Sequence, residues 1–206
     1  KTCTDNLKVI FDLPKGYHVA FTSSANEVWE RIIQNLIYDN SAHLINGAFS
    51  QKFYDFTKMY GINSKSYFFN KEPYKIKNIK NEFELISVSL NETSTGIMCN
   101  NDTINQIRKK FNNSLIALDC TSGSPSISFE AKNVDTFYFS VQKCFGLPPG
   151  LGVWIYNDKC ISAYEKKNEL GGITGSYHSL KKLHKMNLKS QTPETPNILG
   201  IYLLMK

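Results

Sequence analysis

The chain has 206 residues, of which 41% are hydrophobic and 13% aromatic, and its formal net charge is +6 at pH 7. This composition supports a sizeable hydrophobic core and predicts one large domain. The sequence contains no apolar run long enough to span a membrane, and its scattered lysines accompany no known nucleic-acid-binding motif. We therefore expect neither a membrane nor a nucleic acid as the main partner.

The five cysteines are odd in number and widely spaced. They form no C-x-x-C pair and no framework of close spacings, which favours a reducing, cytoplasmic setting. The chain does not begin with Met, and it stops within the apolar, helix-like stretch Ile198–Met205, which carries no helix stop signal. We expect from this pattern that more protein follows.

Short apolar runs predict the β-strands in chain order. Several are apolar almost throughout, which is typical of strands that are covered on both faces. The runs are Tyr17–Thr22, Ala42–Ile45, Leu85–Leu90, Leu115–Leu118, Thr136–Ser140 and Val153–Tyr156.

Segments with a helical period lie between these runs, at Ala25–Tyr38, Ser50–Tyr60 and Asp102–Phe111. The second carries Phe53 on its apolar face and is followed by Gly61, where a helix C-terminus favours glycine. Strands that alternate with helices predict crossover connections and a mainly parallel sheet. The fold class is therefore α/β.

Ligands of such sheets bind at the carboxyl ends of the strands, so the residues after each apolar run are candidates for a site. Thr22–Asn26 (TSSAN) joins the first strand to a helix, whose free N–H groups could hold a phosphate. However, Ser24 and Glu27 also fit an S-x-x-E capping box, which needs no ligand. Asn91–Gly96 (NETSTG) follows a later strand and could hold a polar ring or form an ordinary turn.

Asp119 ends the run LIALD. A carboxylate at the end of a buried strand is costly unless it is paired. It could cap a helix, bind a metal ion or pair with a cation. No histidine or second carboxylate lies near it in the sequence, which disfavours a metal site.

Gln142 and Lys143 follow the next apolar run, and the Gly/Pro-rich loop Gly146–Gly152 comes soon after. The apolar neighbours of Lys143 predict a desolvated, uncharged amine, which is a nucleophile toward an aldehyde. The alternative is a lysine whose side chain reaches from the strand end into water.

Together and in order, these features resemble the pyridoxal 5′-phosphate (PLP) site of class V aminotransferases of fold type I, over nearly the whole chain. The strongest stretch, Phe139–Gly152 (FSVQKCFGLPPGLG), is similar to the segment that carries the Schiff-base lysine of that family. NETSTG, LIALD and Thr192–Asn197 (TPETPN) each match a further family motif. The closest likeness is to phosphoserine aminotransferases and their alanine–glyoxylate relatives.

The resemblance implies a three-layer α/β/α fold with a mainly parallel, mixed sheet. Residues 1–206 would form the PLP-binding large domain, without the N-terminal arm and the C-terminal small domain of the family. Lys143 would form the Schiff base and shuttle the proton, and Asp119 would pair with the pyridine nitrogen of the cofactor. No metal ion is implied.

The other roles are also implied by the resemblance. Thr93 would bond the ring hydroxyl, and Phe49 (in GAF) would stack on the ring, although it also fits a core residue that opens a helix. Thr195 would reach the phosphate in the partner subunit, which implies a homodimer. The phosphate in the chain's own site would be held by Ser24, Ala25 and Asn26, with Gln142 beside it.

The implied activity is amino-group transfer, with phosphoserine and 2-oxoglutarate as the favoured pair, as in serine biosynthesis. The alternatives are an alanine or serine aminotransferase that uses glyoxylate or pyruvate, a class V lyase of the cysteine-desulfurase type, and, outside enzymes, a non-catalytic α/β module that binds a small ligand. Arginine usually binds a substrate carboxylate. We expect neither Arg31 nor Arg108, the arginines of this sequence, to face the cofactor.

Overall fold

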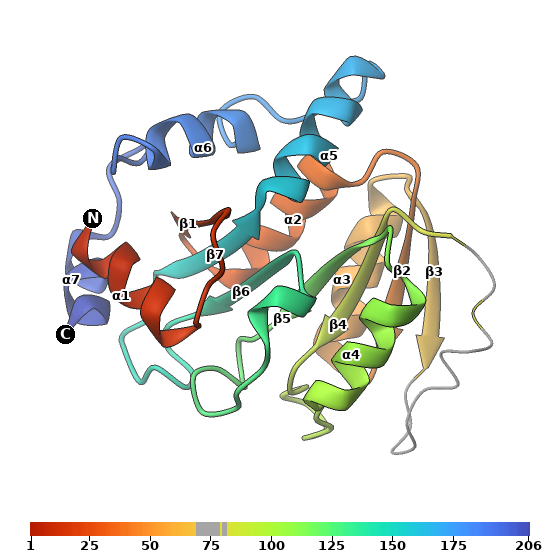
Figure 1. Ribbon diagram of the computed structural model, residues 1–206, viewed down its shortest axis with the longest axis horizontal. Helices are drawn as coiled ribbons and strands as arrows, with labels where there is room; N and C mark the ends of the chain where they lie inside the picture. Colours follow the sequence, from red (N-terminus) through yellow and green to blue (C-terminus); the bar gives the residue numbers. More distant parts are fainter. Residues whose placement is uncertain (69–78, 80–81) are drawn as a thin grey trace.

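A seven-stranded sheet forms the centre of the computed structural model, which describes residues 1–68, 79 and 82–206 (Figure 1). The strand order is β1-β7-β6-β5-β4-β2-β3. β7 pairs antiparallel with both of its neighbours, and the other described pairs are parallel, which confirms the mainly parallel, mixed sheet. The strands are β1 (Tyr17–Thr22), β2 (Asn40–Ile45), β3 (Asn63–Phe68), β4 (Leu85–Ser89), β5 (Leu115–Asp119), β6 (Thr136–Ser140) and β7 (Gly152–Asn157).

Helices cover both faces of this sheet, and the first and last helices lie side by side (Figure 1). The Asn6 side chain donates to the Met205 carbonyl oxygen at 2.9 Å, so the two ends of the described chain are held together. The helices are α1 (Thr2–Ile10), α2 (Ala25–Leu36), α3 (Ala48–Met59), α4 (Asn101–Lys110), α5 (Asp158–Glu169), α6 (Leu180–Asn187) and α7 (Ile198–Met205), with a 3₁₀ turn at Ala131–Asn133.

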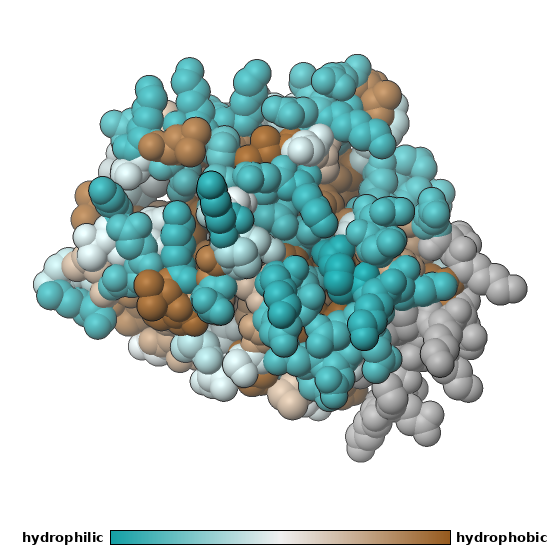
Figure 2. Space-filling view, viewed as in Figure 1, coloured by the Kyte–Doolittle hydropathy of each residue, from teal (hydrophilic) through white to brown (hydrophobic). Residues whose placement is uncertain are grey.

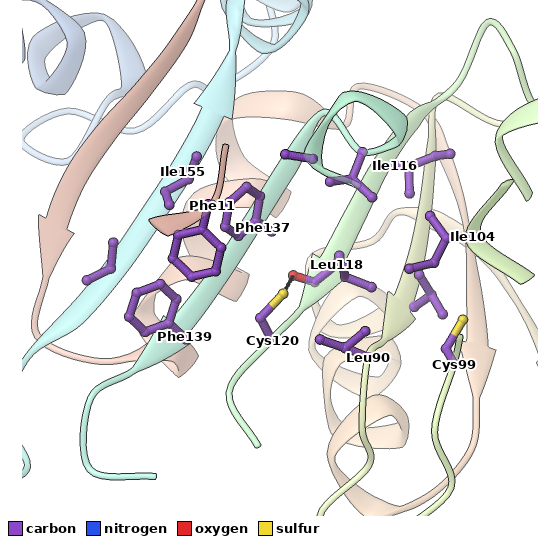
Figure 3. Packing of buried hydrophobic residues seen from close by; sticks show 14 of the residues in the cluster. Phe11, Leu90, Cys99, Ile104, Ile116, Leu118, Cys120, Phe137, Phe139 and Ile155 are labelled. Carbon is purple, nitrogen blue, oxygen red and sulfur yellow. Dashed lines mark hydrogen bonds between the residues drawn. The ribbon is translucent and has the colours of Figure 1, made fainter. Parts of the chain in front are cut away.

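Two hydrophobic cores lie on opposite faces of the sheet because successive strand residues point in opposite directions. On β5, Ile116 and Leu118 pack into the core beneath α1, α4 and α7, where Figure 3 shows them beside Phe137. Leu115 and Ala117 pack into the core beneath α2, α3, α5 and α6. Each large apolar side chain that is buried contributes about 1.5–3 kcal/mol. The predicted three-layer α/β/α fold is therefore confirmed.

The predicted strands and helices all form, with small shifts at their ends. The helix predicted at Ser50–Tyr60 begins earlier, at Ala48, and Gly61 adopts φ +77° just after it, as expected of a C-terminal glycine. The sequence did not predict α1, β3, α5 or α6. β3 lies at the edge of the sheet, and its residues are mostly polar and partly exposed, so it lacks the apolar run of a central strand.

The face of the molecule shown in Figure 2 is mainly polar. Hydrophilic side chains cover most of the face in Figure 2, and hydrophobic residues form small separate patches on it. Among the described residues, no helix combines the length and the apolar character that crossing a bilayer requires.

Candidate functional site

A cavity of about 250 Å³ lies where β4, β5 and β6 end, next to the first turns of α2 and α3. This is the edge at which a parallel sheet places its ligands. The predicted site residues, except Ser24 and Thr195, all line it: Ala25, Asn26, Phe49, Thr93, Asp119, Gln142 and Lys143. The cavity also has lining residues that the sequence did not single out, among them Trp29, Glu92 and Ser140.

The turn before α2 is held by side-chain caps. Ser24 is the N-cap residue, and its Oγ accepts from the Glu27 N–H at 3.2 Å, so the capping interpretation of this serine is correct. The Ala25 N–H donates to Ser140 Oγ at 2.7 Å, which ties the turn to the end of β6. Asn26 follows these capped positions, is exposed, and lines the cavity.

Gly152 allows this turn to approach the sheet. A Cβ atom on Gly152 would lie 2.5 Å from the Ser24 carbonyl carbon and 2.7 Å from its oxygen. Those atoms belong to the backbone and cannot move aside cheaply. The glycine at the end of the Gly/Pro-rich loop is therefore required by the close contact between β7 and the turn that opens α2.

Asp119 is partly buried and has few partners that could stabilise its charge. Its Oδ1 accepts from the Thr121 N–H at 2.9 Å, but no cation of the described residues lies within ion-pair distance. Burial raises the pKa of Asp119, and the nearby negative charge of Glu92 adds to this increase. The carboxylate borders the cavity, so a ligand can reach it.

Polar atoms with unused hydrogen-bonding capacity lie among the described residues at this end of the sheet. Trp29 Nε1, Thr121 Oγ1 and Tyr138 OH are buried and have no hydrogen-bond partner there. Trp29 and Thr121 line the cavity with Asp119, whereas Tyr138 lies beside Asp119 in the paired strand. Buried polar groups are normally satisfied, so such a group of atoms indicates a place for a polar ligand or water.

Lys143 lies in the same cavity lining as Asp119, but its side chain is exposed. The expected desolvation by its apolar neighbours in the sequence is therefore wrong for this chain. The reason is geometric, since Val141 points into the core whereas Gln142, Lys143 and Cys144 are in a turn that projects from the end of β6. Gln142 is likewise exposed and lines the cavity.

Thr93 and Phe49 lie on the wall formed by the NETSTG segment and α3. The Thr93 hydroxyl forms a hydrogen bond with the Ser122 hydroxyl, so the segments after β4 and β5 meet here. Phe49 is half-buried in the first turn of α3, where it both packs against the core and borders the cavity. The interpretation of Phe49 as a core residue that opens a helix is therefore confirmed, and its stacking on a ring stays a prediction.

Thr195 is exposed in the segment between α6 and α7 and is not among the residues that line the cavity. The arginines also lie elsewhere. Arg31 is buried, pairs with Glu27 and donates to the His178 carbonyl oxygen at 3.2 Å. Arg108 pairs with Asp135. Neither lines the cavity, as expected. The described residues contain no cluster of His, Cys, Asp and Glu that could hold a metal ion.

Comparisons with known proteins identify the family. The model of the family described as "Aminotransferase class-V" matches residues 70–206. The phosphoserine aminotransferase of Rhodococcus opacus is 30% identical over 199 residues, which cover 95% of this chain and 52% of that protein. The corresponding enzyme of Corynebacterium glutamicum is 29% identical over 209 residues, which cover 97% of this chain and 53% of that enzyme.

Comparison with solved structures agrees with this family assignment. The phosphoserine aminotransferase of Cytophaga hutchinsonii superposes with a TM-score of 0.92 at 40% identity, over 99% of this chain and 57% of that one. The alanine–glyoxylate aminotransferase of Nostoc sp. shares the fold, with a TM-score of 0.83 at 17% identity over 99% of this chain and 56% of that one. The chain spans about half the length of the curated relatives that it matches. It belongs to the class V aminotransferase family.

Proposed function

We propose that this chain is the PLP-binding large domain of a phosphoserine aminotransferase, which transfers an amino group between phosphoserine and 2-oxoglutarate. The names of the relatives above support phosphoserine as the amino donor, and 2-oxoglutarate is the acceptor that the resemblance implies. The observation that carries the proposal is that two complementary groups line one cavity. Asp119 is a partly buried carboxylate that no described cation pairs, and Lys143 is an exposed lysine that lines the same cavity.

The residues of the cavity fit PLP. A protonated ring nitrogen would supply the cation that Asp119 lacks, and ligand atoms could use the free hydrogen-bonding capacity of Trp29 and Thr121. The volume of about 250 Å³ is close to the lower end of the range of small-molecule pockets, roughly 300–1,000 Å³, which suits a single-ring ligand. When bound, PLP supplies a conjugated ring that stabilises negative charge on the neighbouring substrate carbon.

The amino acids of this chain would then act as follows. Asp119 would hold the ring nitrogen in its protonated state, because a carboxylate with little access to water favours a cation beside it. Lys143 would hold the cofactor through its amine and, once substrate displaces it, would carry the proton to and from the substrate carbon. Phe49 covers one face of the ring, and Thr93 bonds the ring hydroxyl.

The phosphate would lie at the start of α2. Asn26 and Gln142 would donate to it, and the positive end of the α2 dipole favours an anion there. Ser24 and Ala25 complete the phosphate turn, but their contribution is mainly to its shape, because Ser24 Oγ caps Glu27 and the Ala25 N–H is bonded to Ser140.

We also propose that the protein acts as a homodimer in the cytoplasm. Thr195 is exposed and outside the cavity of its own chain, which is compatible with a contact to the partner's phosphate. The cysteines are all free, as in a reducing compartment. A size measurement on the purified protein, with and without PLP, would test the dimer. A monomer under both conditions would contradict it.

The first experiment tests the lysine. The purified protein is incubated with PLP, reduced with borohydride and digested, and the modified peptide is identified by mass spectrometry. We expect the label on Lys143. Lys132 and Lys159 are the internal controls, because their exposed side chains are open to nonspecific labelling. A label on these or on other scattered lysines, with Lys143 unmodified, would remove the proposed function.

The second experiment tests the substrate. Phosphoserine, alanine, serine and cysteine are offered in turn, with 2-oxoglutarate, glyoxylate or pyruvate as acceptor. Keto-acid formation from phosphoserine with 2-oxoglutarate is expected. A preference for alanine or serine with glyoxylate would favour the alternative aminotransferase, and sulfur release from cysteine would favour the lyase. The class V family and its relatives disfavour the non-catalytic alternative.

A further inference from the structure

Glu92 is a buried carboxylate beside the cavity that the roles above do not use. Only 1% of its surface is exposed, and no described cation pairs with it. Its oxygens are nevertheless well satisfied. Oε1 accepts from the Phe49 N–H at 3.3 Å, and from the N–H and Oγ of Ser94 at 3.1 and 2.8 Å. Oε2 accepts from the N–H and Oγ of Ser50, both at 3.0 Å.

These bonds form the cap of α3. The first N–H groups of a helix have no intrahelical acceptor, and Gly47, the N-cap residue, has no side chain to offer one. Glu92 accepts from Phe49 and Ser50, and Ser94 Oγ accepts from the Ala48 N–H at 2.8 Å. The cap therefore comes from a different segment of the chain, and the negative charge of Glu92 suits the positive end of the helix dipole.

Gly47 packs closely against the side chains of Glu92 and Ser94. A Cβ atom on Gly47 would lie 2.4 Å from Glu92 Cγ and 2.4 Å from Ser94 Oγ. The backbone of α3 is therefore in direct contact with the Glu92 side chain. Burial opposes the ionisation of Glu92, but the N–H and hydroxyl donors outweigh it and lower its pKa. The carboxylate is thus anionic, closely packed and bonded on both oxygens.

The α3 cap, defined as Glu92 and Ser94, lies between two groups of the site. Phe49 is the residue whose N–H Glu92 binds, and Thr93 is the residue between the two members of the cap. Phe49 and Thr93 both line the cavity, and so does Glu92. Phe49 and Thr93 are far apart in the sequence, and the bonds of the α3 cap join the two segments that carry them. Glu92 also places a second negative charge near Asp119.

We propose that Glu92 is a positioning residue of this site. It holds the start of α3 against the segment after β4, which fixes Phe49 and Thr93 relative to each other on one wall of the cavity, and its charge adds to that of Asp119 in favouring a protonated ring nitrogen. This inference rests on the proposed function. The structure distinguishes Glu92 from an ordinary helix cap, because a cap remote from the cavity would hold a helix without touching a ligand-facing residue.

The test compares Glu92→Gln with Asn100→Ala in the purified protein. Asn100 caps α4 by accepting from the Thr103 N–H at 2.9 Å, and it does not line the cavity, so it is a matched control for the loss of a cap. The readouts are the PLP dissociation constant, the absorbance of bound PLP as a function of pH, and thermal unfolding without PLP.

For Glu92→Gln we expect PLP affinity to fall at least tenfold, because the amide nitrogen of Gln cannot accept from the α3 donors. The midpoint of the pH-dependent absorbance change should move to lower pH, because the removed negative charge no longer stabilises the cation. Asn100→Ala should lower the unfolding temperature but leave the PLP affinity and the absorbance midpoint unchanged. Ser94→Ala, which removes the acceptor for Ala48 and one donor to Glu92, should weaken PLP binding in the same direction with a smaller fold-change.

The outcomes separate the two proposals. If wild-type protein is labelled on Lys143 but Glu92→Gln and Ser94→Ala both match Asn100→Ala, with unchanged affinity and absorbance, Glu92 is a structural cap and the positioning role is wrong. If Glu92→Gln does not fold, Ser94→Ala decides alone, by the same criteria. If wild-type protein forms no adduct on Lys143, the proposed function fails and the positioning role fails with it.

Discussion

Two aspartates at opposite ends of the central strands show how this sheet separates structure from function. Asp135 precedes β6 at its amino end and is only 2% exposed. It pairs with Arg108, accepts from the Ile116 N–H at 2.8 Å and from the Asn157 side chain at 3.0 Å, and lies 3.7 Å from Lys159 Nζ.

Asp119 is the last residue of β5, at the carboxyl end, and it has fewer hydrogen-bond donors and cations around it than Asp135. Among the described residues it accepts from the Thr121 N–H and has no cationic partner. A buried charge is tolerated when it is paired and is costly when it is not. Asp135 therefore stabilises the fold through its own contacts. Asp119 keeps free capacity to accept hydrogen bonds and to pair with a cation, which a ligand could use.

The largest effect is expected for Asp135→Asn, which leaves the guanidinium of Arg108 largely buried without its carboxylate. Breaking a buried ion pair from one side costs about 3–5 kcal/mol of unfolding free energy. Urea denaturation without PLP measures this, and Lys132→Ala, at an exposed ion pair with Glu130, is the control that should change little. A loss below about 1 kcal/mol would mean that the amino end of the sheet does not depend on Asp135.

Asp119→Asn should lower activity and not stability, the opposite of Asp135→Asn. We expect turnover to fall about 100-fold, equivalent to about 2.7 kcal/mol, because the neutral amide no longer holds the ring nitrogen protonated. The adduct on Lys143 should still form. The unfolding free energy without PLP should stay the same or rise, since an unpaired buried charge is removed. Near-normal turnover of this variant with phosphoserine would contradict the role of Asp119.

The dependence of stability on acid pH should distinguish Asp119 from His43, a buried residue of β2. Burial lowers the pKa of His43 from an ordinary value of 6.5 to about 3. Below pH 6.5 the unfolded chain binds a proton that folded His43 does not, so stability falls as the pH falls. Between pH 7 and pH 5 this costs about 2 kcal/mol.

The raised pKa of Asp119 acts in the other direction, because its contribution to stability is present below the ordinary pKa of 3.8 and is lost as the pH rises through the folded value. Unfolding free energies at pH 7, 6 and 5 should therefore decline less steeply in His43→Leu than in wild type, and at least as steeply in Asp119→Asn. Parallel curves for wild type and His43→Leu would show that His43 does not govern the acid response.

The smallest effect is expected for Ser140→Ala, which removes the acceptor of the Ala25 N–H at the functional end of the sheet. The loss of this bond should cost about 1 kcal/mol of stability. It should also weaken PLP binding, because the turn that opens α2 is less firmly held. A titration with PLP and a thermal melt measure the two effects. A loss of stability with unchanged PLP affinity would show that this turn does not contribute to phosphate binding.

Much of the candidate site could be predicted from the sequence because its groups follow apolar runs. The run LIALD ends in Asp119, and TFYFS is followed closely by Lys143, so the rule that parallel sheets bind ligands at their carboxyl ends brings them together in the cavity. The role of Ser24 as a helix cap was also visible in the spacing of Ser24 and Glu27. The exposed position of Lys143 was not, because sequence neighbours do not show which way a turn projects.

Glu92 shows most clearly what the sequence could not reveal. Within NETSTG it is one polar residue of a turn, and only the fold brings it to the N–H groups of Phe49 and Ser50, which are 43 and 42 positions away. The same holds for Ser140 and Ala25, which are 115 positions apart.

The sequence by itself determined the α/β class, the family, and the order along the chain of the polar residues that follow each strand. The reason is that apolar periodicity and local motifs are properties of short segments. Only the tertiary structure decided which polar groups are satisfied and which are left open. Hydrogen-bond and charge pairing join residues distant in sequence, so the contrast between Asp135 and Asp119 exists only after the chain has folded.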